Sequence, residues 1–167
     1  MPRKTIGIDP GLTGALALIV DDECIRVIDM PTMEKTHGRG KEVNPYVLAD
    51  QIMGLIADSG GTERDVTVCI ERVSAMPGQG VTSMFSFGHS AGVIDGVCGG
   101  LSLSTAYVTP ARWKRSLGIA GRPKSTSITV ATRLYPEVSD MLRRRKDIGR
   151  ADAILIAHYH HSIGVGS

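Results

Sequence analysis

The opening segment of the chain constrains the fold most. Residues 5–8 are apolar or β-branched, as in a buried strand, and Asp9 ends that run. A Pro-Gly pair follows, and a second apolar run, Ala15–Val20, begins shortly afterwards. Burying a strand that ends in a carboxylate costs free energy unless the charge meets a cation. The segment therefore predicts two antiparallel strands whose connection carries a candidate metal ligand, Asp9.

Length and composition favour one globular α/β domain. The chain has 167 residues, of which 42% are apolar and 22% charged, and it contains no apolar run long enough to span a membrane. The start of the sequence lacks the organisation of a signal peptide. The three cysteines match neither a disulfide framework nor a zinc site. We therefore expect reduced core cysteines and a cytoplasmic protein.

Hydrophobic periodicity predicts strands and helices in a mixed order. Three closely spaced strands at the start predict an antiparallel meander, and later strands separated by helices predict parallel pairing. The result is a mixed sheet flanked by helices, with residues 31–44 as a polar loop. The expected strands are 5–8, 15–20, 24–28, 66–70 and 101–108, and the expected helices are 45–57, 82–97, 111–117, 125–134 and 149–161.

Charge is distributed unevenly along the chain. Residues 109–150 contain eleven Lys or Arg but only three acidic residues, although the whole chain has a net charge of only +2. Such asymmetry is typical of a protein that binds a polyanion such as nucleic acid. A solvated basic surface without a partner is the alternative that charge alone leaves open.

Three acidic residues form the candidate catalytic and metal-binding set. Asp9 and Glu71 each end a predicted strand, and Asp152 lies near the start of the last helix. The carboxyl ends of neighbouring parallel strands meet at one sheet edge, so these side chains can converge. Hard oxygen ligands select Mg²⁺ or Mn²⁺, and a pair of such ions can hydrolyse a phosphodiester. Taken singly, the three residues also fit a turn, a surface ion pair and a helix start.

Three motifs in this order resemble the RuvC-type Holliday-junction resolvases of the RNase H-like superfamily. They are residues 7–14 (GIDPGLTG), the pair Ile70-Glu71 and residues 150–153 (RADA). The compact length is similar to that of phage members, so the resemblance implies a bacterial or phage-infected cell as the setting. The resemblance implies an RNase H-like domain over residues 1–167, with a mixed five-stranded sheet. It also implies a homodimer that nicks four-way DNA junctions symmetrically with Mg²⁺, two ions at each active site, and Asp9, Glu71 and Asp152 as metal ligands.

One position departs from the family pattern. The family usually places an Asp or His three positions before the last Asp, and this chain has Gly149 there. We expect Asp147 to replace that residue as a fourth catalytic and metal-binding acid. His158 is a weaker candidate because, six positions after Asp152, it points to another side of the helix.

DNA contacts are expected mainly from the basic segment and from the loop and helix that follow Glu71. For Phe85 and Phe87, stacking on DNA and packing in the core or in a dimer interface both stay open, and for Trp113 packing is preferred to DNA contact. The glycine-rich helix 82–97 is the expected dimer interface. The predicted DNA-binding residues are Lys114, Arg115, Arg122, Lys124, Arg144, Arg145, Arg150 and Phe85.

The function predicted from the sequence is therefore a crossover junction endodeoxyribonuclease acting in DNA recombination and repair. An RNase H-like nuclease for other branched DNA or RNA–DNA hybrids is one alternative, because the hydrolytic chemistry is the same. A junction-binding protein with weakened catalysis is another, because of Gly149. A sugar-kinase or actin-like ATPase is excluded by length, because that fold needs a second similar domain.

Overall fold

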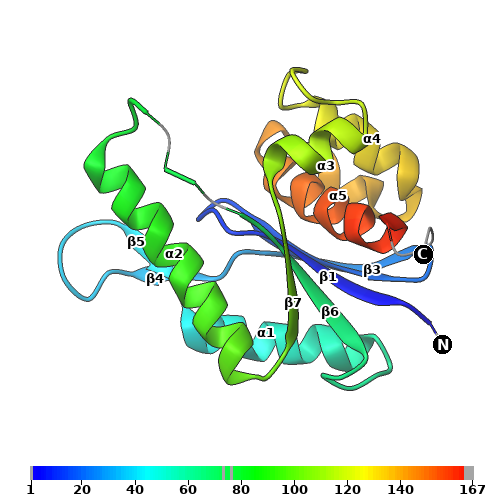
Figure 1. Ribbon diagram of the computed structural model, residues 1–167, viewed down its shortest axis with the longest axis horizontal. Helices are drawn as coiled ribbons and strands as arrows, with labels where there is room; N and C mark the ends of the chain where they lie inside the picture. The colour runs from blue at the N-terminus through cyan, green and yellow to red at the C-terminus, as the bar shows by residue number, and fades with distance from the viewer. Residues whose placement is uncertain (1, 73, 76, 164–167) are drawn as a thin grey trace.

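A five-stranded mixed sheet forms the centre of the molecule (Figure 1). The computed structural model describes residues 2–72, 74–75 and 77–163. The strand order is β3-β2-β1-β6-β7, with β1–β2 and β2–β3 antiparallel and β1–β6 and β6–β7 parallel. This confirms the predicted mixed sheet with an antiparallel meander. The strands are β1 (Lys4–Asp9), β2 (Ala15–Val20), β3 (Glu23–Asp29), β6 (Val66–Glu71) and β7 (Ser104–Val108).

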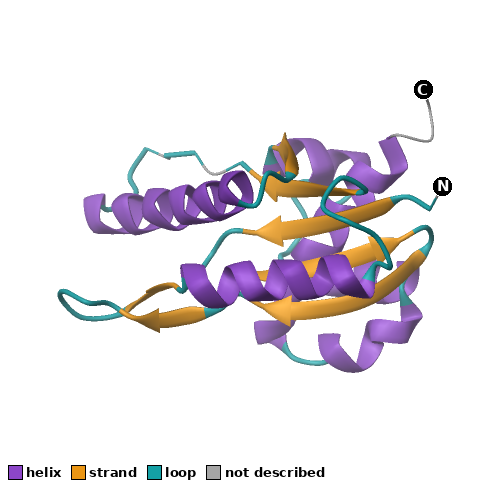
Figure 2. Ribbon diagram, turned by 90° about the horizontal axis from the view of Figure 1, so that it is seen from below, coloured by secondary structure: helices purple, strands orange, loops and turns teal. Residues whose placement is uncertain are grey.

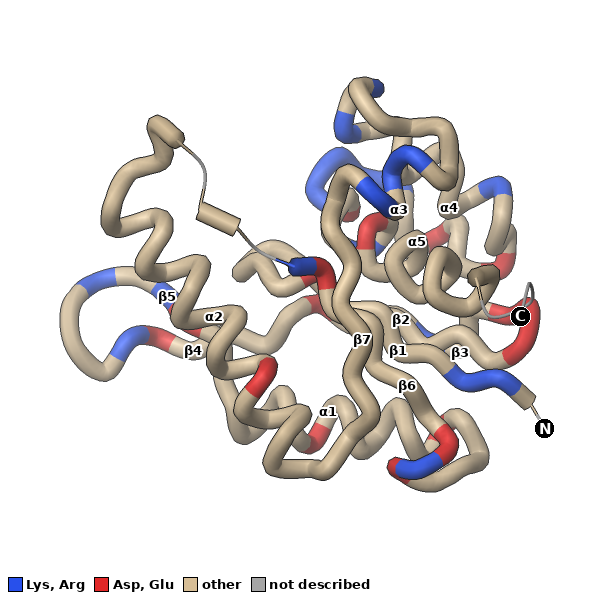
Figure 3. The backbone as a smooth tube through the Cα atoms, viewed as in Figure 1, with Lys and Arg blue, Asp and Glu red and all other residues tan. Residues whose placement is uncertain are grey.

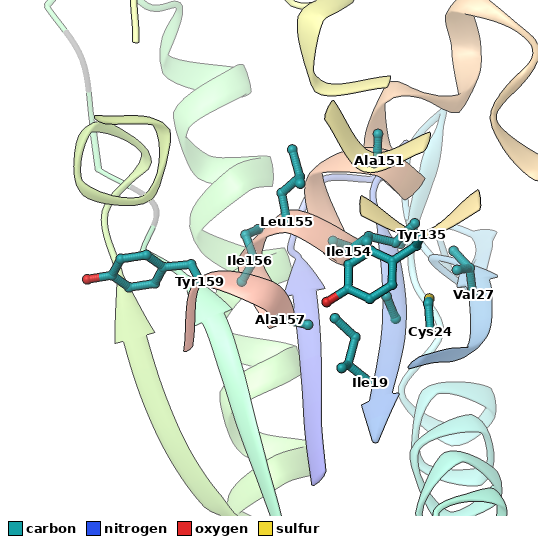
Figure 4. Close-up of a cluster of buried hydrophobic side chains, with 14 of the residues drawn as sticks. Ile19, Cys24, Val27, Tyr135, Ala151, Ile154, Leu155, Ile156, Ala157 and Tyr159 are labelled. Atoms are coloured by element: carbon teal, nitrogen blue, oxygen red, sulfur yellow. The ribbon is translucent and has the colours of Figure 1, made fainter. Parts of the chain in front are cut away.

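Helices cover both faces of the sheet. Because side chains alternate along a strand, Ile6 and Ile8 of β1 join the core on one face and Ala15 and Ala17 of β2 join the core on the other. The first core is closed by α1 (Pro45–Asp58) and α2 (Val81–Gly100), and the second by α3 (Pro110–Ser116), α4 (Thr126–Leu134) and α5 (Ile148–Ile163). Figure 4 shows the second core, where side chains of α5 meet those of β2 and β3.

Helix α5 approaches β1 unusually closely. A Cβ atom built on Gly7 would lie 2.2 Å from the carbonyl oxygen of Ala153 and 2.5 Å from the backbone nitrogen of Ala157. No larger residue fits at position 7 without moving the helix. The close approach brings the start of α5, and with it Asp152, toward the sheet edge where β1 ends.

The prediction of a polar loop over residues 31–44 is wrong. This segment contains a short antiparallel hairpin, β4 (Thr32–Glu34) paired with β5 (Lys41–Val43), with Gly38 and Gly40 at positive φ in its turn. The hairpin and α2 both extend beyond the end of the five-stranded sheet (Figure 2).

The remaining differences lie at element boundaries and in the basic segment. Helix α2 runs to Gly100, so β7 begins at Ser104, later than predicted, after a turn in which Ser102 has a positive φ. Two short 3₁₀ helices that the periodicity did not indicate precede α5, namely η1 (Pro136–Leu142) and η2 (Arg145–Asp147).

The buried position of the three cysteines agrees with the expectation from composition. Cys24, Cys69 and Cys98 are buried and free, as expected for reduced core residues. Within the described ranges, no helix is long and apolar enough to cross a membrane.

Candidate functional site

Asp9 is held at the end of β1 by a tight turn. The backbone N–H of Gly11 donates to Asp9 Oδ1 at 3.3 Å, and the N–H of Gly14 donates to the carbonyl of Gly11 at 2.8 Å. A Cβ atom on Gly14 would lie 2.1 Å from the carbonyl oxygen of Asp9, so the turn requires glycine there. The glycines of the first motif therefore fix the backbone that carries the carboxylate.

Glu71 lies beside Asp9 because their strands are parallel neighbours. The register pairs Ile8 of β1 with Ile70 of β6, so the next residues, Asp9 and Glu71, leave the sheet at the same edge. Glu71 Oε2 accepts a hydrogen bond of 2.6 Å from the indole nitrogen of Trp113. Trp113 is fully buried, which confirms that it packs inside the protein.

Asp152 reaches the same edge from α5. Its carboxylate is hydrogen-bonded to Ser127 of α4, while Asp152 Oδ1 is buried and has no hydrogen-bond partner. A buried carboxylate oxygen without a donor is costly, and a bound cation would remove that cost.

The three carboxylates line one open cleft of about 1060 Å³. Its walls come from the turn after β1, the β4–β5 hairpin, the first half of α2, and the basic segment. Figure 3 shows Lys and Arg gathered around α3 and α4, with further Lys and Arg on the hairpin. The basic side chains lining the cleft are Lys35, Lys41, Lys114, Lys124, Arg145 and Lys146.

Burial raises the pKa of all three acids, and repulsion between carboxylates adds to the shift at Asp9 and Glu71. Burial, followed by the charges of Glu71 and Asp152, raises the pKa of Asp9 to about 7. Burial is also the main cause of the raised pKa values of Glu71 and Asp152. The Trp113 hydrogen bond opposes the shift at Glu71, and the Ser127 hydrogen bond opposes it at Asp152. A divalent cation would favour the ionised form of all three.

The donor set fits a hard divalent cation. It consists of carboxylate oxygens, which suit Mg²⁺ or Mn²⁺, and it includes the unpartnered Asp152 Oδ1. Among the residues with a described position, no group of three or more acidic, His or Cys side chains is arranged as a ready-made metal centre. The carboxylates thus share the cleft without being drawn together to one point.

The structure does not bring Asp147 into this cleft. Its buried carboxylate accepts hydrogen bonds from the backbone nitrogen of Arg144 at 2.8 Å and from the Arg144 guanidinium at 2.9 Å. The same arginine holds the pKa of Asp147 below its usual range. Asp147 therefore stabilises the turn before α5 and lies outside the cleft that the other three acids line. His158 also lies elsewhere, hydrogen-bonded to the Tyr135 hydroxyl at 2.8 Å.

Gly149 occupies the position where the RuvC-type pattern usually has a further Asp or His, and the surrounding backbone is packed closely against it. A Cβ atom built there would lie 2.2 Å from the carbonyl oxygen of Thr13 and 3.0 Å from the Cα of Gly14. The turn after β1 occupies the space that a side chain at this position would need.

The predicted DNA-binding residues divide into three groups. Lys114, Lys124 and Arg145 line the cleft, whereas Arg115 and Arg122 are exposed outside it. Arg144 is half exposed but bound to Asp147, and it lines an adjoining groove.

Arg150, another predicted DNA contact, is engaged with other residues of the protein and does not line the cleft. Its guanidinium forms a two-point pair with Asp29, at 2.6 and 2.7 Å, and also donates to the carbonyl of Met141. It joins α5 to the end of β3, a role that the spacing of the sequence did not reveal.

Both phenylalanines of α2 are exposed. Phe85 is 76% exposed and stacks on His89, while Phe87 lines the cleft. The interpretation of Phe85 as a core residue of its own chain is therefore wrong.

Sequence reasoning missed Lys35, Lys41 and Ser127. The glycines in the turn of residues 35–41 were an available signal for a hairpin. No local pattern marks Ser127, because its role comes from the packing of α4 on α5.

The chain is similar to known proteins in sequence and in fold. No protein-family model matches the chain. Over 89 residues, 53% of its length, it is 34% identical to "Holliday junction resolvase MOC1, chloroplastic" of Chlamydomonas reinhardtii. The match covers only a tenth of that relative's length.

Two solved RuvC structures of Thermus thermophilus are similar over nearly the whole chain. One, "T. thermophilus RuvC in complex with Holliday junction substrate", has a TM-score of 0.60 at 16% identity, and the other a TM-score of 0.55 at 14% identity. Both comparisons cover 98% of this chain and 96% of the other. The chain therefore has the fold of these two RuvC structures.

Proposed function

We propose that this protein is a metal-dependent endonuclease that resolves four-way DNA junctions by symmetric phosphodiester hydrolysis, in DNA recombination and repair. The observation that carries the proposal is that Asp9, Glu71 and Asp152 line one cleft together with five lysines and Arg145. Acidic ligands and cations in the same cleft suit a phosphodiester, which needs both a metal and a counter-charge. The names of the similar proteins support DNA junctions as the substrate.

Asp9, Glu71 and Asp152 would hold Mg²⁺, two ions at each site, with Mn²⁺ as a substitute. Such ions supply an activated water and stabilise the leaving oxygen. The role of the protein is to hold three ionised carboxylates at the cleft and to limit water around them. Asp147 is left out of this ligand set because Arg144 occupies its carboxylate.

Positive charge around the cleft would hold the DNA backbone. Lys114 and Lys124 line the cleft together with the three acids, so their ammonium groups can bind a phosphate near the cut. Lys35 and Lys41 line it from the β4–β5 hairpin. Sequence-independent contacts of this kind suit recognition by the shape of the DNA.

A two-fold dimer is proposed as the working unit, because two symmetric cuts require two symmetric sites. Helix α2 is the proposed interface. It buries only Ser90, Ile94 and Cys98 in its own chain, and Cβ atoms built on its glycines meet no atom within 4 Å. The glycine side of α2 is thus open to a second copy.

Cleavage of a synthetic mobile four-way junction in Mg²⁺ tests the function. Linear duplex, a Y-shaped fork and an RNA–DNA hybrid serve as competing substrates, and Asp152→Asn is compared with Asp140→Asn, a matched change at an exposed acid. We expect paired symmetric nicks in the junction alone, lost only in Asp152→Asn. Equal cutting of forks or hybrids would redirect the proposal to a broader nuclease.

A junction-binding protein with weakened catalysis is the second candidate, favoured by one observation. The space at Gly149 excludes the additional acid that the family pattern contains. Tight junction binding by the wild-type protein without cleavage in Mg²⁺ or Mn²⁺ would support this candidate.

A further inference from the structure

Trp113 is the only tryptophan of the chain, and it bonds directly to one of the three site acids. Its side chain is fully buried, and its indole N–H lies 2.6 Å from Glu71 Oε2. Lys114 Nζ lies over the same ring, 5.1 Å from its centre. One buried side chain therefore contacts two residues that line the cleft.

The backbone places Trp113 there for a simple reason. Glu71 and Val108 are register partners at the ends of the parallel strands β6 and β7, and the N–H of Arg72 donates to the carbonyl of Val108 at 2.7 Å. Helix α3 begins at Pro110, so Trp113 lies in its first turn, directly after that strand end. Core packing around the ring prevents the indole from swinging away.

The chemistry of indole suits the task of holding a metal-binding carboxylate. Its N–H can only donate, and it carries no charge. It fixes the orientation of the Glu71 carboxylate without supplying a positive charge that would compete with a cation. A carboxylate has about four acceptor positions, so a single donor leaves most of them available.

We propose that Trp113 is a positioning residue that orients Glu71 for divalent-metal binding and makes the fluorescence of this chain a direct reporter of that binding. The inference rests on the proposed function, because it takes Glu71 as a metal ligand. Hydrogen-bond partners of metal ligands typically contribute 10–100-fold to metal affinity. Loss of the single indole N–H should therefore weaken metal binding by about that factor.

The first test compares Mn²⁺ affinity, measured without DNA by electron paramagnetic resonance, in wild type, Trp113→Phe and Tyr135→Phe. Trp113→Phe keeps an aromatic ring and removes the donor. Tyr135→Phe is the matched control, because it removes one buried aromatic hydroxyl that is hydrogen-bonded to His158 instead. We expect a 10–100-fold weaker affinity in Trp113→Phe only.

Equal affinities in wild type and Trp113→Phe would overturn the inference while leaving the proposed function intact. No Mn²⁺ binding by the wild-type protein would remove the proposed metal site, and the inference with it.

The second test uses the wild-type fold, so it holds even if Trp113→Phe fails to fold. Tryptophan emission is followed during a Mg²⁺ titration of wild type and of Glu71→Ala. A saturable change in wild type that is absent in Glu71→Ala supports the inference, and an unchanged emission at saturating Mg²⁺ overturns it.

Discussion

Two groups of acidic side chains lie close together in this molecule and have opposite surroundings. Asp147 and Asp152 are five residues apart. Asp147 is bound by Arg144, and its neighbour Asp29 by Arg150, and these arginines lower both pKa values. In the cleft, burial raises the pKa of each acid, most strongly that of Asp9.

This difference in partners and in pKa distinguishes the acids that stabilise the fold from the acids proposed to bind metal. A carboxylate with an arginine partner is already neutralised and contributes to the fold. The cleft acids repel one another and include an oxygen without a donor, so they destabilise the metal-free protein. Under the proposed function, a divalent cation that is not part of the chain would complete this arrangement.

The largest expected difference is in the rate of junction cleavage, between a variant that removes a charge from the cleft acids and one that removes a charge from the arginine-bound acids. Asp152→Asn is expected to lower junction cleavage by about 10³-fold, since metal stabilisation of the reaction contributes several kcal/mol. Asp147→Asn should leave the rate within about threefold at a temperature where it stays folded, because that carboxylate stabilises structure only. Single-turnover cleavage under matched conditions measures both. Similar losses in the two variants would remove the distinction between the groups.

The second effect concerns pH and the stability of the metal-free protein. The folded-state pKa of Asp9 is raised to about 7 from 3.8, so between these values the folded state keeps a proton that the unfolded state releases. Stability therefore falls as pH rises through this window, and the whole penalty is present above pH 7. Asp9→Asn should be more stable than wild type at pH 8 in EDTA, by about 4 kcal/mol at most, and equal to it near pH 4.

Urea unfolding at pH 4, 6 and 8 measures this difference. Saturating Mg²⁺ at pH 8 should narrow it, because the metal binds only the folded wild type well. If Asp9→Asn and wild type lose stability in parallel as pH rises, the raised pKa of Asp9 is not its source.

The sequence allowed the sheet and the acids of the cleft to be predicted, but not which acids are paired. Asp9 and Glu71 end apolar strands, so strand pairing alone brings them together. The partners of Asp147 and Arg150 depend on how the 3₁₀ turn folds against α5 and β3, which no periodicity encodes. Lys35 and Lys41 were missed for a related reason, since a three-residue strand is too short to show alternation.

Gly149 lies in the sequence between Asp147 and Asp152. Substituting it tests whether a side chain can be accommodated at this position beside the cleft. Gly149→Ala should destabilise the protein by about 1–3 kcal/mol, because its Cβ would overlap the backbone of Thr13. The matched control is Gly54→Ala in α1, where a Cβ meets no atom within 4 Å and should stabilise by about 0.5–1 kcal/mol. Thermal unfolding compares the two, and a stabilised Gly149→Ala variant would show that a side chain fits there after all.

The last prediction compares the stability contributed by two arginine-paired acids that differ in burial. Asp147 is 4% exposed and accepts three side-chain or backbone donors from one arginine, whereas Asp140 is 79% exposed and pairs only with Arg143. Asp147→Asn should cost about 1.5–3 kcal/mol of unfolding free energy, since hydrogen bonds to a charged group are lost in a buried place. Asp140→Asn should cost less than about 1 kcal/mol, because water screens an exposed pair. Urea unfolding at neutral pH measures both. Equal losses of unfolding free energy in the two variants would show that burial does not strengthen the Arg144–Asp147 pair. The contrast between Asp147 and the cleft acids would then depend only on the presence of an arginine partner.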